Sequence, residues 1–315
     1  MDFNSISLVP RVISKIESRN DIKIKINIFN HNYEASFTAP IIASPMKDVC
    51  DSKVARIMAK NGGLGVLHRF NTIEDQVEEF RKSDLVTACA IGVEGDSFDR
   101  YQALKEAGCT LFVIDTANGA NIKVERMAKK MNANIIVGNV ASKECFEWLQ
   151  DIDNVVGIRV GIAGGSACLT RNATGIYHGM ASCIAECASV KNEKVLLIAD
   201  GGIKEPGDFC KAIALGADMV ILGSEIAATK DSPAEILIKD SKSYKIMHGS
   251  ASHEIQKNYR ETPRYIEGRT RLLESNDEHL SDLITRYCDG LRSSMSYFNS
   301  LNLEEYREKI SFEKN

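Results

Sequence analysis

The most constraining feature of this chain is an alternation of short apolar runs with amphipathic stretches between residues 40 and 223. The runs are rich in Val and Ile and nearly continuous, as at 195–199 and 219–222. Parallel strands covered on both faces read this way, because neither face meets water. We therefore predict eight strands, at residues 40–45, 64–68, 86–92, 111–116, 134–140, 155–161, 195–201 and 219–223.

The stretches between these runs carry helix-capping residues. Thr72 precedes an acidic first turn, and Pro206 opens another helix that ends just before Gly216. Eight strands alternating with helices predict an α/β fold in which the sheet closes into a (β/α)8 TIM barrel. A doubly wound open sheet is the alternative, but no Gly-x-Gly-x-x-Gly motif follows the first strand.

We expect one domain with two flanking extensions. Residues 1–39 form an N-terminal arm, in which Ile22, Ile24 and Ile26 alternate with Lys23 and Lys25 as in an edge strand with one wet face. The barrel covers residues 40–235. Residues 236–315 then hold an active-site loop, a polar segment around 239–245 and a charged C-terminal segment, and we expect the last helix within residues 225–315.

The amino-acid composition limits the kinds of partner that the protein can bind. The net charge is −4, with 39 Lys and Arg against 43 Asp and Glu, whereas a nucleic-acid binder needs a basic face. No apolar run reaches the ~20 residues that span a bilayer, and the N-terminus does not resemble a secretion signal. The nine Cys are odd in number and lack Cys-x-x-Cys spacing. We expect a cytoplasmic protein that binds neither nucleic acid nor membranes.

The loop after the sixth predicted strand holds the strongest candidate for chemistry. Gly161, Gly164, Gly165 and Ser166 precede Cys168, and these residues permit a tight backbone that approaches a ligand closely. Neighbouring amides in such a loop can cradle an anion and favour the thiolate, the nucleophilic form of cysteine. A small buried Cys that closes a turn is the simpler alternative here, and we expect the other eight cysteines to be structural.

The loops after the seventh and eighth strands form the usual phosphate site of a TIM barrel. They contain Asp200, Gly201, Gly202, Gly223 and Ser224. A carboxylate there can accept ribose hydroxyls, while exposed amides can bind a phosphate. The pattern predicts a phosphate-bearing ligand, with a turn capped by an aspartate as the alternative.

Taken in order, these motifs make the chain similar to the IMP dehydrogenase / GMP reductase family. The resemblance runs from residue 8 to residue 297 and is strongest at 161–175, 200–202 and 222–224. It implies a (β/α)8 barrel, usually a homotetramer, that binds a purine nucleotide monophosphate, GMP or IMP, beside a nicotinamide cofactor.

The resemblance also implies roles for individual residues. Cys168 would attack purine C2 and form a thioimidate, with Thr170 and Glu267 transferring protons beside it. The residues that would bind the nucleotide are Ser166, Asp200, Gly201, Gly202, Gly223, Ser224, Gly249, Ser250 and Arg264. Those that would face the cofactor are His68, Asp115, Thr116, Ala117 and Asn139. Backbone carbonyls of Ala163, Gly165 and Cys168 match a monovalent-cation site, for K⁺.

Two features favour the reductase branch of this family. Dehydrogenases normally carry paired CBS modules between the second and third strands, where this chain has only residues 81–84. They also have a long flap with an Arg-Tyr pair, whereas residues 249–267 are few and Arg264-Tyr265 stands almost against Glu267. The resemblance therefore implies a GMP reductase that uses NADPH to convert GMP to IMP and ammonia.

Other positions keep alternatives open. Ser44-Pro45-Met46 is similar to the dehydrogenases, Lys47 replaces a usual Asp, and Ile266 replaces a Ser. The first alternative is an IMP dehydrogenase without CBS modules, which would oxidise IMP to XMP with NAD. The second is a non-catalytic barrel that binds purine nucleotides. A modified purine nucleotide is a further candidate substrate.

Overall fold

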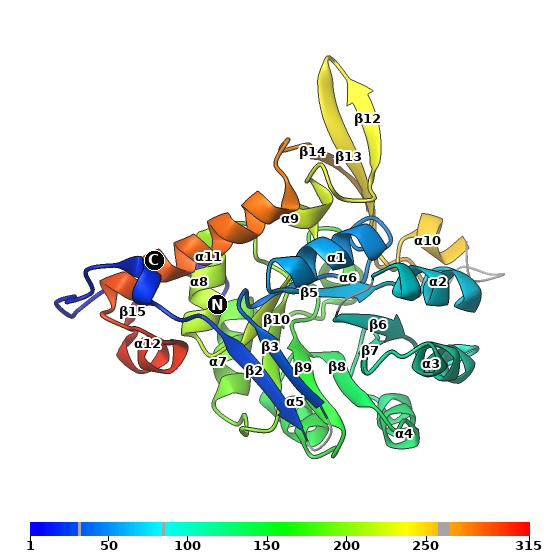
Figure 1. Cartoon of the computed structure of the whole chain (residues 1–315), viewed down its shortest axis with the longest axis horizontal. Helices are drawn as coiled ribbons and strands as arrows, with labels where there is room; N and C mark the ends of the chain where they lie inside the picture. The colour runs from blue at the N-terminus through cyan, green and yellow to red at the C-terminus, as the bar shows by residue number, and fades with distance from the viewer. Residues whose placement is uncertain (31–32, 84–85, 258–264) are drawn as a thin grey trace.

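The computed structural model describes residues 1–30, 33–83, 86–257 and 265–315. Eight parallel strands close into a barrel in the order β10-β11-β4-β5-β6-β7-β8-β9 (Figure 1). These strands are β4 (Ile41–Ala43), β5 (Leu64–Leu67), β6 (Thr87–Ile91), β7 (Leu111–Asp115), β8 (Asn134–Val140), β9 (Val155–Val160), β10 (Leu196–Asp200) and β11 (Met219–Leu222). All eight predicted strands are confirmed to within two residues at each end, and closure of the sheet excludes the doubly wound alternative.

Helices cover the outside of the barrel, and several of them start at capping residues. They are α1 (Ser52–Lys60), α2 (Ile73–Ser83), α3 (Ser97–Glu106), α4 (Ile122–Lys130), α5 (Lys143–Gln150), α7 (Met180–Ala188) and α8 (Pro206–Ala214). The Asp51 side chain accepts the Val54 amide at 2.8 Å, and the Thr72 hydroxyl accepts the Asp75 amide at 3.1 Å. No helix in the described part of the chain is long and apolar enough to cross a bilayer.

The segment after β11 is more structured than predicted. A short helix, α9 (Ser224–Ala227), leads to an antiparallel sheet that projects from the barrel (Figure 1). Its strands are β12 (Glu235–Lys239), β13 (Lys242–His248) and β14 (Thr270–Glu274). The predicted polar segment is thus the turn and flanking strands of a hairpin. Its strands looked like a loop because both faces of β12 meet water.

The predicted C-terminal segment also folds onto the barrel. After α10 (His253–Lys257) and β14, the long helix α11 (Leu280–Tyr297) packs against α8 and α1 and supplies the eighth outer helix. The chain then forms α12 (Leu303–Lys309) and β15 (Phe312–Lys314). β15 pairs with β1 (Ile6–Leu8), so this segment is not a free charged tail.

The N-terminal arm confirms the predicted alternation but not the predicted start of the strand. It contains two short 3-10 helices, η1 (Phe3–Ser5) and η2 (Arg19–Asp21), and a hairpin of β2 (Ile26–Asn30) and β3 (Tyr33–Phe37). Ile22 and Ile24 are buried while Lys23 and Lys25 are exposed. The strand begins only at residue 26, because the Lys23 amide donates to the Leu301 carbonyl at 2.8 Å instead of to a neighbouring strand.

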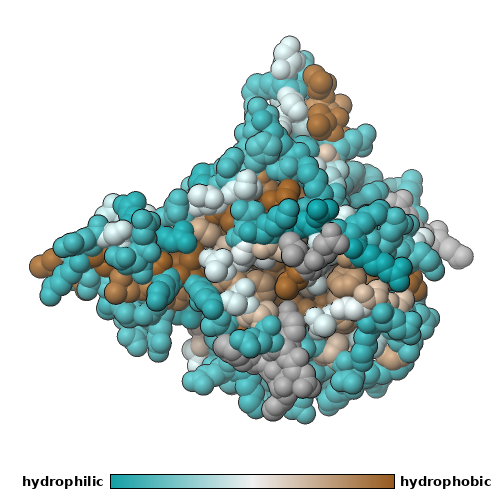
Figure 2. All heavy atoms as spheres, viewed as in Figure 1, coloured by the Kyte–Doolittle hydropathy of each residue, from teal (hydrophilic) through white to brown (hydrophobic). Residues whose placement is uncertain are grey.

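The projecting sheet leaves apolar side chains in solvent. Ile236 and Ile238 of β12 are 60% and 76% exposed. Figure 2 shows apolar surface gathered on this projection, on the side where Figure 1 places β12. Exposed apolar residues that lie together commonly mark a contact surface.

Candidate active site

A cleft of about 1820 Å³ opens over the carboxyl ends of the barrel strands. Loops that follow all eight strands line it, as expected for the catalytic end of a TIM barrel. The predicted site residues that line it are His68, Asp115, Thr116, Ala117, Asn139, Ala163, Gly165, Ser166, Cys168, Thr170, Asp200, Gly201, Gly202, Gly223, Ser224, Gly249, Ser250 and Glu267. Arg264 lies outside the described residues.

The loop that carries Cys168 is joined to residues 265–269 by an antiparallel bridge between Cys168 and Gly268. The Leu169 amide donates to the Glu267 carbonyl at 2.7 Å, and the Arg269 amide donates to the Ala167 carbonyl at 3.0 Å. Gly268 also lies close to residues 251–252, since a Cβ there would lie 2.7 Å from the Ser252 amide nitrogen. The bridge brings together two segments that are far apart in the sequence.

The bridge places three functional groups in one hydrogen-bonded chain. The Cys168 thiol donates to Thr170 Oγ1 at 3.2 Å, and the Thr170 hydroxyl donates to Glu267 Oε2 at 2.7 Å. Thr170 is the first residue of α6 (Thr170–Thr174). The start of this helix therefore fixes the place of its hydroxyl relative to the thiol. Such a chain can carry a proton between a sulfur nucleophile and a carboxylate.

Asp200 is held by one of its two carboxylate oxygens. Oδ2 accepts hydrogen bonds from Nε and Nη2 of Arg159, at 3.0 and 2.7 Å, and from Nδ2 of Asn139 at 2.8 Å. Among the described residues no donor reaches Oδ1. A fixed carboxylate with one free oxygen at the cleft can accept ligand hydroxyl groups.

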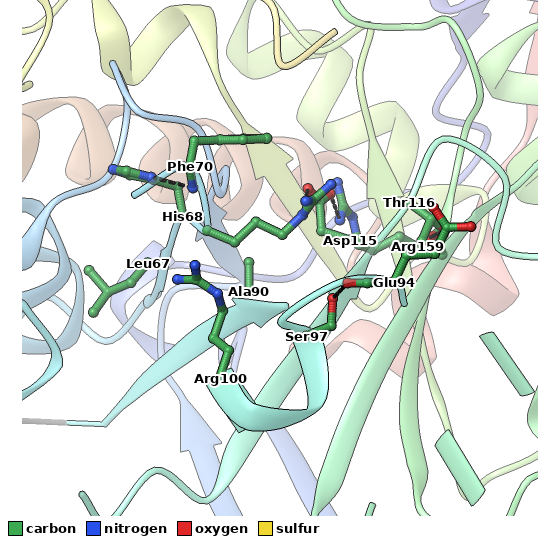
Figure 3. A network of polar contacts seen from close by, with 12 residues as sticks. Leu67, His68, Phe70, Ala90, Glu94, Ser97, Arg100, Asp115, Thr116 and Arg159 are labelled. Atoms are coloured by element: carbon green, nitrogen blue, oxygen red, sulfur yellow. Dashed lines mark hydrogen bonds and ion pairs between the residues drawn. The ribbon is translucent and has the colours of Figure 1, made fainter. Parts of the chain in front are cut away.

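Asp115 lies on the other side of the same arginine. Arg159 Nη1 donates to Asp115 Oδ1 at 2.7 Å (Figure 3), and Arg69 Nε lies 3.6 Å from Asp115 Oδ2. Burial alone would lower the pKa of Arg159, but Asp200 and Asp115 together raise it above its usual value. Sequence reasoning missed Arg159, although an arginine within the apolar run Val155–Val160 signals a buried charge that needs partners.

The loop after β5 is held by Arg100, which Figure 3 also shows. Its guanidinium donates to the Asn71 carbonyl at 2.7 Å, to Gln76 Oε1 at 2.8 Å and to Asp96 Oδ2 at 2.8 Å. His68 begins this loop, and its Nδ1 accepts the Phe70 amide at 3.1 Å. The neutral imidazole therefore carries its hydrogen on Nε2.

The loops after β9 and β10 pack closely at glycines. Gly201 has φ +99°, and a Cβ there would lie 2.7 Å from the Gly164 carbonyl carbon. In the adjoining loop, the buried Ser166 Oγ has no hydrogen-bond partner among the described residues. The Gly249 amide, in contrast, donates to the Arg269 carbonyl at 3.1 Å. This amide is therefore already engaged, although Gly249 itself lines the cleft.

A contact between Asp48 and His248 was not predicted. Asp48 Oδ2 accepts the amide of His248 at 2.7 Å and makes a 2.8 Å contact with its Nδ1. This pair ties the loop after β4 to the end of β13, immediately before Gly249. Neither residue stands in a local motif, so only the folded structure brings them together.

Among the described residues, no cluster of three His, Cys, Asp or Glu side chains is arranged to hold a metal ion. A monovalent cation would instead use backbone carbonyls of the Cys168 loop. Ala163 adopts φ +64° in this loop, and the Gly165 carbonyl accepts the Cys168 amide at 3.0 Å. One of the expected cation ligands is thus already engaged within the loop.

The environment of His68 predicts a pH dependence of stability. Burial, followed by the charge of Lys47, lowers the pKa of His68 from its usual 6.5 to about 4. Between these two values the unfolded chain binds more protons than the folded chain, so stability falls as pH falls through this window.

We expect His68→Gln to flatten this dependence. From pH 7 to pH 5 the wild type should lose about 1–2 kcal/mol more of its free energy of unfolding than the variant does. Urea unfolding at both pH values measures the two losses. Equal losses would contradict a depressed His68 pKa.

The chain is similar in sequence to known enzymes. The chain is 30% identical to the GMP reductase of Streptococcus equi subsp. equi and 31% identical to that of Chromobacterium violaceum, over 97% and 98% of its length and 92% and 96% of theirs. It is 28% identical to the inosine-5'-monophosphate dehydrogenase of Cryptosporidium parvum, over 99% of its length and 91% of that protein.

A solved structure shares the fold. The GMP reductase of Trypanosoma brucei in complex with guanosine 5'-monophosphate superimposes with a TM-score of 0.92 at 22% identity, covering 100% of this chain and 95% of that one. The family model described as the IMP dehydrogenase / GMP reductase domain matches residues 1–315. The chain is therefore a member of the IMP dehydrogenase / GMP reductase family.

Proposed function

We propose that the chain catalyses the reductive deamination of GMP to IMP and ammonia, with NADPH as the hydride donor. The observation that carries the proposal is the hydrogen-bonded chain of Cys168, Thr170 and Glu267. The thiol offers a nucleophile for purine C2, while the hydroxyl and the carboxylate offer a proton path to a leaving amine. Relatives named GMP reductase at 30% and 31% identity over nearly the whole chain support this direction.

The proposed reaction has two steps at purine C2. The first forms the C2–S bond and breaks the bond from C2 to the 2-amino group. Cys168 Sγ bonds to C2 and passes its proton through Thr170 to Glu267. Glu267 returns that proton to the 2-amino group, which leaves as ammonia, and a thioimidate remains on Cys168. When NADPH is bound, it supplies a hydride to C2. The C2–S bond then breaks, IMP is released, and a proton from solvent restores the thiol.

The substrate side of the cleft fits a purine monophosphate. The free Oδ1 of Asp200 would accept ribose hydroxyls, and the unpartnered Oγ of Ser166 would donate to the phosphate. The glycine-rich ends of β10 and β11 would complete the phosphate site, through Gly201, Gly202, Gly223 and Ser224. Ser250 is proposed to contact the base. Arg264 is proposed to bind the nucleotide, on resemblance alone. The trypanosomal relative was solved with GMP, which supports this ligand class.

The cofactor side combines carboxylate, amide and cationic groups. His68, Asp115, Thr116, Ala117 and Asn139 would face the nicotinamide half. Lys47 and Arg69 line the same cleft, and Lys47 forms no ion pair with a described residue. NADPH rather than NADH is proposed on resemblance alone.

The proposal also covers the oligomeric state, the cellular location and a bound cation. We propose a homotetramer, because the exposed apolar residues of β12 offer a surface for contact between copies. All nine cysteines are free thiols, which supports a reducing compartment such as the cytoplasm. A K⁺ ion would bind carbonyls of Ala163, Gly165 and Cys168 and order the catalytic loop.

Turnover with GMP and NADPH tests the proposed reaction. We expect loss of nicotinamide absorbance with release of one ammonia per hydride, and no activity from Cys168→Ala. Activity with IMP and NAD but none with GMP would show a dehydrogenase instead. Binding of GMP without any turnover would show a non-catalytic barrel.

Removing the Thr170 hydroxyl tests the proton path. Thr170→Val keeps the side-chain volume and should lower kcat about 10²- to 10⁴-fold, with the KM for GMP little changed. Thr170→Ser restores the hydroxyl and should recover most of the activity. Steady-state kinetics on both variants measures the difference, and a Val variant as fast as the wild type would rule out proton transfer through residue 170.

A further inference from the structure

A buried arginine contacts both halves of the proposed site. Arg159 lies in β9 with its side chain 7% exposed. It binds Asp200, on the ribose side, through Nε and Nη2. It binds Asp115, on the cofactor side, through Nη1 (Figure 3). Among the described residues no other side chain donates a hydrogen bond to both carboxylates.

These contacts link three side chains into one hydrogen-bonded unit. The guanidinium is planar, so its donors keep a fixed mutual geometry. A shift of either carboxylate must then move the other or break a charged hydrogen bond in a largely buried site, and breaking such a pair is costly. Asn139 holds the Asp200 end of the unit, and Arg69 lies beside its Asp115 end.

We propose that Arg159 is a positioning residue that couples nucleotide binding to cofactor binding. Binding of ribose hydroxyls to Asp200 would order the unit. Asp115 would then already be ordered when the cofactor binds. The second ligand to bind thereby loses less conformational entropy, and linkage makes the effect equal in both directions. This inference rests on the proposed function, because it takes ribose as the ligand of Asp200 and the nicotinamide cofactor as that of Asp115.

Calorimetry in the Cys168→Ala background measures this coupling without turnover. The Kd of GMP is determined with and without saturating NADPH. With Arg159 present, NADPH should tighten GMP binding about 5-fold or more, the lower end of the usual range for coupled sites. Arg159→Gln should bring the ratio close to one. Arg159→Lys keeps the charge but not the planar fork, and should restore only part of the ratio.

Arg307 provides a matched control at the opposite end of the barrel. It donates to Asp218 at 3.0 Å and to the Ala217 carbonyl at 2.7 Å, just before β11. Arg307→Gln should keep the full ratio, which separates coupling from a general loss of stability.

Each outcome decides the proposal. A ratio of one with Arg159 present, or a full ratio in Arg159→Gln, would overturn it. If the Gln variant does not fold or bind, the Lys variant decides, since a full ratio there would overturn the proposal and a reduced ratio would support it. A wild type that shows coupling but no turnover with GMP would refute the proposed reaction alone.

Discussion

Two backbone hydrogen bonds hold the chemical half of this molecule together. They run from Leu169 to Glu267 and from Arg269 to Ala167, and they join the loop after β9 to a segment that follows the projecting sheet. Arg269 adds a side-chain contact to the Ser166 carbonyl at 3.2 Å. Without this junction, the Glu267 carboxylate would have no fixed relation to the thiol, and the hydrogen-bonded chain could not form.

The binding half depends instead on the barrel strands. Asp115, Asn139, Arg159 and Asp200 lie at or near the carboxyl ends of β7, β8, β9 and β10, which are neighbours in the sheet. Strand pairing sets the spacing of these side chains, and the buried charges then fix their orientation. The proposed recognition groups thus lie on strands, while the proposed nucleophile lies on a loop.

Much of this arrangement could be predicted from the sequence, because local patterns encode it. Continuous apolar runs located all eight barrel strands, and the glycines around Cys168 marked the proposed catalytic loop. β12 and β13 were not predicted, since exposed strands carry charged residues. The last outer helix was predicted only as lying within residues 225–315, because it follows a long insertion. Glu267 entered only by resemblance, as no local pattern marks it. The partners of Arg159 could not be predicted, because Asp115 and Asp200 lie on two other strands, β7 and β10.

The central claim is that the Cys168 sulfur forms a covalent bond to C2 of a bound purine. Acid quenching during turnover of GMP with NADPH, followed by mass spectrometry of the digested protein, tests it directly. The account predicts a purine nucleotide adduct on the peptide that contains Cys168, and no adduct in Cys168→Ala. Steady turnover with the adduct on another residue, or undiminished turnover by Cys168→Ala, would contradict it.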